Sequence, residues 1–346
     1  MKLFYECNFF EEEFQEKEVF TVEQNELLLK EQVSQEKFSF DKLKVKYSCF
    51  WRKQSDWETS KPTVLIPIKD HPELIAKTIR NLKEKNVTNH CNVIIIDDRS
   101  TEDIESIVTR NGLSYLRVDN EKGFNFSMLN NIAAKICDSL GIKTIILWNS
   151  DLWCVEEEWL VALLDMHEEQ SNMLTGTKLV YPPLEESLHN KQDTENIEDF
   201  FPEMKNGRWR NTVQFGGPAW IDTSNVSFIH FSPIHYGRFK EIHHSYVDCN
   251  RGVSFITGAF HIWNLKKYIS LGGLNPTMAT LFQDVDICLK LLENGDVPYY
   301  YGKNLYFYHD ESYSLSSGKK KNSLQQVTDH VIFSKIWDKK VKQLVF

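Results

Sequence analysis

The segment TIILWNSDLW, residues 144–153, joins an apolar run directly to three polar residues. Residues 144–148 are mostly β-branched, aliphatic or aromatic, which is typical of a short strand buried on both faces. Asn149, Ser150 and Asp151 then end the run before apolar residues return. A carboxylate set among apolar residues costs free energy unless a cation, a hydrogen-bond donor or water meets it. The strand end is therefore either a capped turn or the floor of a site.

Three more strand-like runs precede this segment and alternate with helical patterns. The runs are TVLIPI at 63–68, CNVIIIDD at 91–98 and LSYLRV at 113–118. The stretch after the first run carries apolar residues at helical spacing, namely Leu74, Ile75, Ile79 and Leu82. A second helix is expected from Thr101 as its N-cap to Gly112 as its stop. The alternation of strands and helices predicts an α/β fold with a parallel sheet covered by helices on both faces.

The remaining segments show weaker patterns. Residues 1–60 are charged and aromatic, and we expect helices or an irregular extension there. Residues 184–211 are polar and predict an insertion or loop. The aromatic run 297–312 predicts a last strand, and 324–345 a terminal helix. Between them, Lys319 to Lys321 give a basic loop that either folds over a diphosphate or is simply solvated.

Composition excludes several classes of protein. The chain has 346 residues, 41% of them hydrophobic, and a formal net charge of -9, so a general nucleic-acid-binding face is not expected. Seven cysteines contain no CxxC pair, which favours core thiols in a reducing compartment over a zinc site. No apolar stretch approaches the ~20 residues of a membrane span. We expect a protein of the cytoplasm with no transmembrane segment.

Acidic residues follow three of the predicted strands. Asp70 follows the first, Asp97 and Asp98 end the second, and Asp151 follows the fourth. Parallel sheets bind ligands beyond the carboxyl ends of their strands. Each Asp taken alone is more often a turn or cap residue, but the set favours a site.

Two of these positions suggest a divalent cation. Mg²⁺ takes one or two carboxylates together with phosphate oxygens and water, and Asp151 is placed to supply one, with Asn149 beside it. The alternative is that Asp151 caps the helix expected near Glu156. His309, after the aromatic run, is either a further metal ligand or a structural histidine.

Two further groups carry candidate chemistry. Asp284 and Asp286 lie two residues apart at the start of a helix, so they diverge by about 200° and cannot share one task. One of them could act as a general base, or both could cap the helix. The segment EKGFNFSMLNN at 121–131 offers hydrogen-bonding groups that either orient a sugar or serve the loop and cap: Asn125, Ser127, Asn130 and Asn131.

These segments, in their order, resemble glycosyltransferase family 2, in particular its bacterial polysaccharide and rhamnosyltransferase-like members. The matching motifs are TVLIPIKD, VIIIDDRSTED, GFNFSMLNN, ILWNSD, TGAFHIW, LGGLN, FQDVDICLKLLENG and YFYHDES. The resemblance implies a GT-A fold over residues 61–312, with a nucleotide-binding half at 61–151 and an acceptor half at 152–312. Residues 1–60 would be an N-terminal extension, and 313–346 the basic loop and C-terminal helix.

The resemblance also implies roles for single residues. Asp98 resembles the acid that contacts the nucleotide base, with Pro67 and Asp70 in the same pocket, and Asn149, Ser150 and the 125–130 segment facing the nucleotide sugar. Asp151 and His309 resemble the ligands of Mn²⁺ or Mg²⁺, and Asp284 the general base of inverting members. Asn149 and Gln283 stand where the family usually has acids.

The implied activity is transfer of a sugar from a nucleotide diphosphate, UDP by family frequency, to a hydroxyl of a glycan or glycoconjugate acceptor. A sugar nucleotidyltransferase would usually carry a Gly-rich phosphate loop, which PIKDHPEL is not. A non-catalytic carbohydrate-binding relative is a second alternative. The two terminal segments are assigned to acceptor binding or to contacts in a homodimer only as open alternatives.

Overall fold

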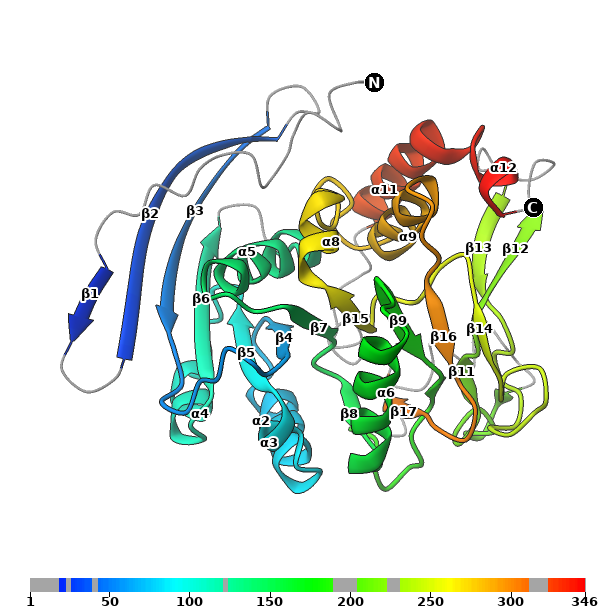
Figure 1. Ribbon diagram of the computed structural model, residues 1–346, viewed down its shortest axis with the longest axis horizontal. Helices are drawn as coiled ribbons and strands as arrows, with labels where there is room; N and C mark the ends of the chain where they lie inside the picture. Colours follow the sequence, from blue (N-terminus) through cyan, green and yellow to red (C-terminus); the bar gives the residue numbers. More distant parts are fainter. Residues whose placement is uncertain are drawn as a thin grey trace.

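The computed structural model describes residues 19–22, 26–38, 43–120, 124–188, 204–222, 231–310 and 323–345. Within these ranges, one eleven-stranded sheet runs through the molecule in the order β1-β2-β3-β6-β5-β4-β7-β15-β9-β16-β14 (Figure 1). Helices pack against this sheet, and a smaller sheet lies beside one end of it.

The four strands predicted from the alternation form the centre of the sheet. They are β4 (Thr63–Ile68), β5 (Asn92–Asp97), β6 (Ser114–Asn120) and β7 (Thr144–Trp148), all parallel in the order β6-β5-β4-β7. Their connections are α2 (Pro72–Glu84), α3 (Val87–His90), α4 (Ile104–Arg110) and α5 (Phe126–Ser139). Every residue of β4 and β5 is buried, as expected for strands covered on both faces.

Of the first two predicted helices, one agrees with the sequence pattern and the other begins at a different cap residue. The apolar face of α2 is buried at Leu74, Ile75, Ile79 and Leu82, which confirms the pattern. The predicted cap of α4 was wrong: Asp103, not Thr101, accepts the hydrogen bond from the Ser106 amide at 3.0 Å. Thr101 is engaged elsewhere, because its amide and hydroxyl both donate to Asp70.

Later strands extend the sheet with mixed polarity. β15 (Phe260–Asn264) lies antiparallel between β7 and β9 (Leu174–Thr177). β16 (Tyr299–Tyr301) is parallel to β9, and β14 (Asn250–Gly252) is antiparallel to β16. The aromatic run predicted as one strand is therefore two, because the chain turns after Tyr301 and continues as β17 (Phe307–His309).

The second sheet has the order β11-β10-β17-β8 and brings together distant parts of the sequence. Its members are β8 (Leu152–Cys154), β10 (Leu179–Val180), β11 (Val213–Phe215) and β17. A separate hairpin joins β12 (Pro218–Asp222) to β13 (Phe231–His235). The remaining helices are α6 (Glu157–Glu169), α8 (Leu265–Ser270), α9 (Gln283–Glu293), α11 (Ser323–Trp337) and α12 (Val341–Val345).

The expectation of helices or irregular structure in residues 1–60 was wrong for the described part between residues 19 and 52. The segment forms β1 (Val19–Val22), β2 (Glu26–Phe38) and β3 (Leu43–Arg52), an antiparallel extension that joins the sheet where β3 pairs with β6. Glu, Lys and Gln in β2 favour a helix by propensity, but pairing along β3 overrides that preference. The predicted basic loop at Lys319 to Lys321 lies outside the described residues. None of the described helices is long and apolar enough to cross a membrane.

Candidate active site

The predicted site residues follow strands that end at one edge of the sheet. From β4 the chain proceeds to β5 and β6 on one side and returns to β7 on the other, so the strand order reverses at β4. Pairing of β4 with β7 ends at Leu65 and Leu147, whereas pairing with β5 continues to Ile68. Pro67, which has no N–H to donate, thus lies where β4 has already parted from β7. Such switch points are where open α/β sheets bind ligands.

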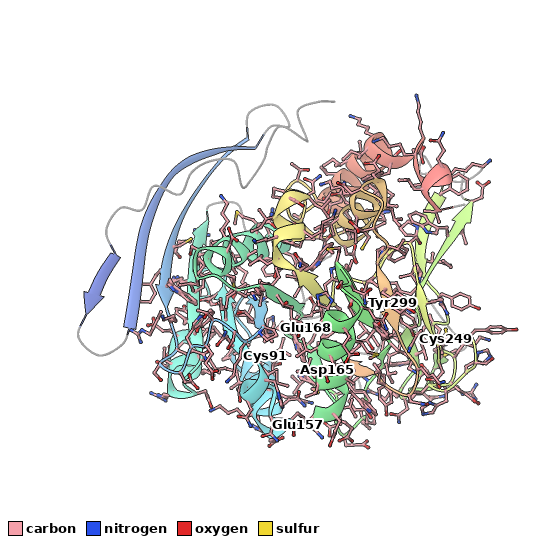
Figure 2. The ribbon with its side chains drawn as sticks, in the orientation of Figure 1. Cys91, Glu157, Asp165, Glu168, Cys249 and Tyr299 are labelled. Atoms are coloured by element: carbon pink, nitrogen blue, oxygen red, sulfur yellow. The ribbon has the colours of Figure 1, made fainter. Side chains whose placement is uncertain are left out.

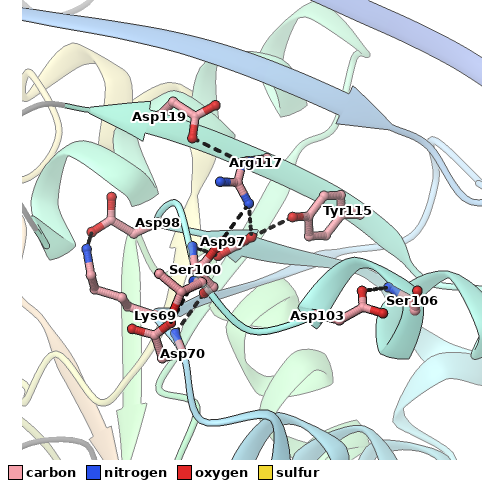
Figure 3. A network of polar contacts seen from close by, with 11 residues as sticks. Lys69, Asp70, Asp97, Asp98, Ser100, Asp103, Ser106, Tyr115, Arg117 and Asp119 are labelled. Carbon is pink, nitrogen blue, oxygen red and sulfur yellow. Dashed lines mark hydrogen bonds and ion pairs between the residues drawn. The ribbon is translucent and has the colours of Figure 1, made fainter.

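Asp98 and Lys69 form a close ion pair at this edge (Figure 3). Lys69 Nζ lies 3.2 Å from Asp98 Oδ2, and the carboxylate is fully buried while the lysine side chain is one-third exposed. Burial raises the pKa of Asp98, and the positive charge of Lys69 opposes the rise. The pair therefore presents a buried acceptor beside a donor that still reaches solvent.

The neighbouring carboxylates hold the loop that carries Asp98 (Figure 3). Asp97 accepts the Ser100 amide at 2.8 Å and faces Arg117 Nη1 at 3.2 Å. Asp70 accepts the amide and hydroxyl of Thr101 at 2.8 and 2.9 Å. Burial alone would raise the pKa of Asp70, but these hydrogen bonds outweigh it and lower the pKa. Asp97 thus ties this loop to β6, and Asp70 ties it to the segment after β4.

A second polar cluster forms where β7 ends. The Asn149 amide donates to Ala259 O at 3.0 Å, and the Leu152 amide donates to Asn149 O at 3.1 Å, so the chain turns there into β8. β8 pairs with β17, which sets Leu152 opposite His309. As a result Asp151 Oδ1 lies 3.2 Å from His309 Nε2, and both side chains are almost fully buried. Asn149 Nδ2 lies 3.4 Å from the same nitrogen.

This geometry separates the two interpretations of Asp151. The residue that precedes α6 as its N-cap is Glu156, which makes no capping hydrogen bond through its side chain. Asp151 instead faces a histidine that the second sheet brings from the far end of the sequence. Ser150 supports the same turn, because its carbonyl accepts a hydrogen bond from the Thr78 hydroxyl of α2. The structure therefore contradicts the alternative in which Asp151 caps α6.

Gln214 fixes the other side of the His309 ring. Its Oε1 lies 3.1 Å from His309 Nδ1, and Gln214 is buried in β11. Because an amide oxygen only accepts, this contact is a hydrogen bond in the tautomer that carries its proton on Nδ1, which leaves Nε2 to face Asp151. This is the arrangement in which a histidine is held ready to ligate a metal through the opposite nitrogen.

The Asp151–His309 pair offers the ligand types of a metal site, but only two of them. Among the described residues, no group of three or more His, Cys, Asp or Glu side chains could hold a metal ion. The Asp151–His309 pair would supply two ligands, which leaves positions for diphosphate oxygens and water. A carboxylate with an imidazole suits Mn²⁺ better than Mg²⁺, since Mg²⁺ strongly prefers oxygen ligands.

Asp284 stands next to this turn, in the first turn of α9. Its carboxylate accepts the Gly258 amide at 2.7 Å and the Val285 amide at 2.8 Å. Gly258 directly precedes Ala259, whose carbonyl accepts the Asn149 amide, so the backbone just before β15 links the two groups. A Cβ atom at Gly258 would lie only 3.1 Å from that of Asp284, so glycine permits the close approach.

The chemistry of Asp284 differs from that of Asp286, as their spacing predicted. Burial raises the pKa of Asp284, although the Gly258 and Val285 amides and nearby His235 oppose the rise. A carboxyl with a raised pKa is a better base once ionised. Asp286 points elsewhere: it accepts Trp337 Nε1 at 2.8 Å and faces Lys290 at 2.8 Å.

The polar residues of the 125–131 segment are engaged with a neighbouring loop. Asn125 caps α5 by accepting the Met128 amide and also donates to Pro276 O at 2.8 Å. Ser127 donates to Met278 O at 3.0 Å, and Asn130 Nδ2 donates to Phe126 O at 2.9 Å. These contacts favour the loop-and-cap alternative, and a sugar contact for these residues stays a prediction.

Three residues of the cluster were missed by sequence reasoning. Lys69 lies between Ile68 and Asp70 in the sequence, and no motif predicted a partner for it. Gln214 and Gly258 carry no motif of their own, because their roles arise from pairings between distant strands.

The fold is that of the GT-A glycosyltransferases. The structure resembles that of GalNAc-T7, solved with UDP, GalNAc and Mn²⁺, with a TM-score of 0.50 at 12% identity, covering 73% of this chain and 44% of that one. At this identity the likeness concerns the fold alone.

A family model matches part of the sequence. Residues 63–227, a little under half of the chain, match the model of glycosyl transferase family 2. The match confirms the resemblance seen in the motifs of this segment.

Two curated relatives also match. Uncharacterized protein y4gI of Sinorhizobium fredii (strain NBRC 101917 / NGR234) is 23% identical over 245 residues, which are 67% of this chain and 23% of that protein. O-antigen biosynthesis protein RfbC of Myxococcus xanthus is 23% identical over 126 residues, 36% of this chain and 10% of that protein. The chain thus spans less than a quarter of the length of either relative.

Proposed function

We propose that the protein transfers a glycosyl group from a nucleotide-diphosphate sugar to a hydroxyl of a glycan or glycoconjugate, with inversion. One observation carries the proposal: the Asp151–His309 pair and Asp284 lie close together at the switch point of the sheet. They are linked because the Asn149 amide donates to Ala259 O, and the neighbouring Gly258 amide donates to Asp284. A metal-ligand pair beside a carboxylate base meets the needs of displacement at an anomeric carbon. The relative RfbC, named for O-antigen biosynthesis, supports a polysaccharide acceptor.

The donor would lie along the sheet edge from Asp98 to Asp151. Asp98 would accept an N–H of the base while Lys69 donates to a base oxygen, which suits uracil. Pro67, Asp70, Asn149 and Ser150 would line the path between base and diphosphate. UDP is the donor nucleotide that we propose, in keeping with the nucleotide in the GalNAc-T7 structure.

Asp151 and His309 would hold Mn²⁺ or Mg²⁺ against the diphosphate. When bound, the ion would neutralise charge on the leaving diphosphate. Asp284 would take the proton from the acceptor hydroxyl, and its raised pKa serves that role. The described cysteines are free thiols, which is consistent with a reducing cytoplasm.

The test begins with calorimetric titration of UDP, GDP and dTDP, each with and without Mn²⁺. We expect one of them, UDP, to bind only with Mn²⁺, and Asp151→Ala to abolish this binding. Asp165→Ala, on the exposed face of α6, is the control that removes an aspartate away from the site (Figure 2).

Turnover separates an enzyme from a carbohydrate-binding relative. UDP release from UDP-sugars should fall by about 10²- to 10⁴-fold in Asp284→Asn while nucleotide affinity stays within about twofold. Metal-independent glycan binding without any UDP release by the wild type would contradict the proposed activity and support the non-catalytic alternative.

A further inference from the structure

We infer that Asp329, on the C-terminal helix α11, is a positioning residue that holds the segment Ala279–Phe282 and thereby sets the place of Asp284. The inference rests on the proposed function, because it concerns the residue proposed as the base. α11 lies beside α9 at one side of the molecule, although some forty residues of sequence separate their starts (Figure 1).

Asp329 makes an unusual number of contacts for one side chain. Its carboxylate is fully buried and accepts the Thr280 amide at 3.0 Å, the Thr280 hydroxyl at 2.8 Å and the Leu281 amide at 2.9 Å. The Ala279 amide also donates to it, at 3.3 Å. These amides belong to the chain just before α9, where no helical partner is available to them. A carboxylate that accepts several N–H groups fixes their direction closely.

Phe282 carries this restraint from the segment to Asp284. It precedes α9 with a φ of +65°, a left-handed conformation that a non-glycine residue keeps only when its surroundings impose it. Its ring stacks on Phe333 of α11 at 4.6 Å and meets the His330 ring edge-on at 4.7 Å. The backbone thus enters α9 in a direction that α11 determines, one residue before Gln283 and two before Asp284.

The same helix holds α9 on the other side of Asp284. Trp337 Nε1 donates to Asp286 Oδ1 at 2.8 Å, and both groups are fully buried. Asp284 is therefore bracketed by a segment and a helical turn that are both bonded to α11. Its own carboxylate is aimed by the Gly258 and Val285 amides, which demand a fixed backbone position. A shift of about 1 Å in a reacting group can cost a hundredfold in rate.

The experiment compares the wild type with Asp329→Asn, which keeps the shape of the side chain and removes its charge. Asp338→Asn, just after α11, makes the same chemical change as the matched control. The first readout needs no substrate: amide hydrogen exchange of peptides that cover 258 and 279–286. We expect exchange there to rise about tenfold in Asp329→Asn and to be unchanged in Asp338→Asn.

The second readout is UDP release from the UDP-sugar that the wild type turns over, with Mn²⁺. We expect kcat to fall about 10- to 100-fold in Asp329→Asn while KM for the donor and calorimetric affinity for UDP stay within about twofold. A general loss of folding would instead lower affinity and kcat together. Should Asp329→Asn not fold, Trp337→Phe keeps the packing and removes only the hydrogen bond to Asp286, with a smaller fall expected in the same direction.

The outcomes separate the inference from the proposed function. Unchanged exchange at 258 and 279–286 in Asp329→Asn overturns the inference. Faster exchange with unchanged kcat, when Asp284→Asn abolishes turnover, overturns it as well. A wild type that neither binds UDP nor releases it refutes the proposed function, while the exchange result still decides whether Asp329 positions Asp284.

Discussion

Two carboxylates at the edge of the sheet have the same spacing to a nitrogen and opposite chemistry. Asp98 lies 3.2 Å from Lys69 Nζ, and Asp151 lies 3.2 Å from His309 Nε2. An ammonium group has three donors and no lone pair, so Lys69 can only neutralise Asp98 or donate beside it. A neutral imidazole nitrogen can ligate a cation, so His309 can share a metal with Asp151. The first pair suits recognition of a base, and the second suits a metal-bound diphosphate.

The surroundings of the two pairs reinforce this difference. Around Asp98 the hydrogen bonds stay within the same sheet edge. They join Asp70 to Ser100 and Thr101, and Asp97 to Ser100. The Asp151 pair is held from outside by Gln214 and by the turn at Asn149. One region is held by contacts among its own residues, and the other by residues from distant strands. We propose that the first receives the base and that the second, with the substrate, holds the metal.

The largest effect is expected from a variant that converts the second pair into a pair of the first kind, with a lysine beside the carboxylate. In His309→Lys, an ammonium would face Asp151 and could not ligate a metal. The structure already holds one buried lysine beside a carboxylate, because Lys178 Nζ lies 2.6 Å from Asp248 Oδ1. We expect metal-dependent UDP binding to disappear and UDP release to fall by about 10³-fold or more, given the several kcal/mol that a bound metal supplies.

The measurement is calorimetry with UDP at several Mn²⁺ concentrations, beside a thermal melt to show that the variant is folded. The control is His90→Lys, which makes the same change in a partly exposed histidine that faces Glu157 and should leave UDP binding unchanged. His167→Lys would not serve, because His167 is a core residue. A folded His309→Lys variant that still binds UDP with the wild-type Mn²⁺ dependence would remove His309 from the metal site.

A smaller effect is expected from the residue behind His309. Gln214→Leu removes the acceptor for Nδ1 while keeping the apolar stem, so the ring loses its preferred tautomer and orientation. Mn²⁺ affinity in the presence of UDP should fall about 10- to 100-fold. Gln214→Glu, which retains an acceptor oxygen, should restore much of it. Equal affinities in the Leu and Glu variants would show that Gln214 only fills space.

The acidic edge of the sheet was predictable because its carboxylates directly follow strands along the chain, whereas Lys69 as the partner of Asp98 was not. The strands β4, β5, β6 and β7 read directly from apolar runs, and Asp98 and Asp151 follow two of them at fixed positions. Parallel strands with helical crossovers bring those ends together by rule. The order of strands and acidic residues along the sequence was therefore enough to predict the acidic edge.

The second region depends on pairings that no local pattern encodes. His309 meets Asp151 because β17 pairs with β8, and Gln214 reaches the ring because β11 lies two strands away through β10. The family resemblance suggested His309, but nothing in the residues suggested Gln214 or the Asp329 contacts. In β2, long-range pairing also overrode a helix-favouring composition, which is why the N-terminal prediction failed.

The smallest effect that we expect is a change in how UDP affinity depends on pH, and it concerns the Asp98–Lys69 pair. Lys69→Met keeps the length of the side chain and removes the charge that opposes the raised pKa of buried Asp98. The pKa of Asp98 should then rise further, and the protonated carboxyl, having lost its negative charge, is a weaker acceptor for an N–H of the base. Since the ionised form is the stronger acceptor, UDP affinity should fall as the pH falls, and the fall should begin at a higher pH in the variant. A shift of one pKa unit corresponds to about tenfold in affinity on the acidic limb.

Lys83→Met, on the exposed side of α2, is the matched control and should leave the pH profile unchanged. UDP titrations at a series of pH values measure the difference, and superimposable profiles for wild type and Lys69→Met would show that Asp98 does not use its charge to hold the base.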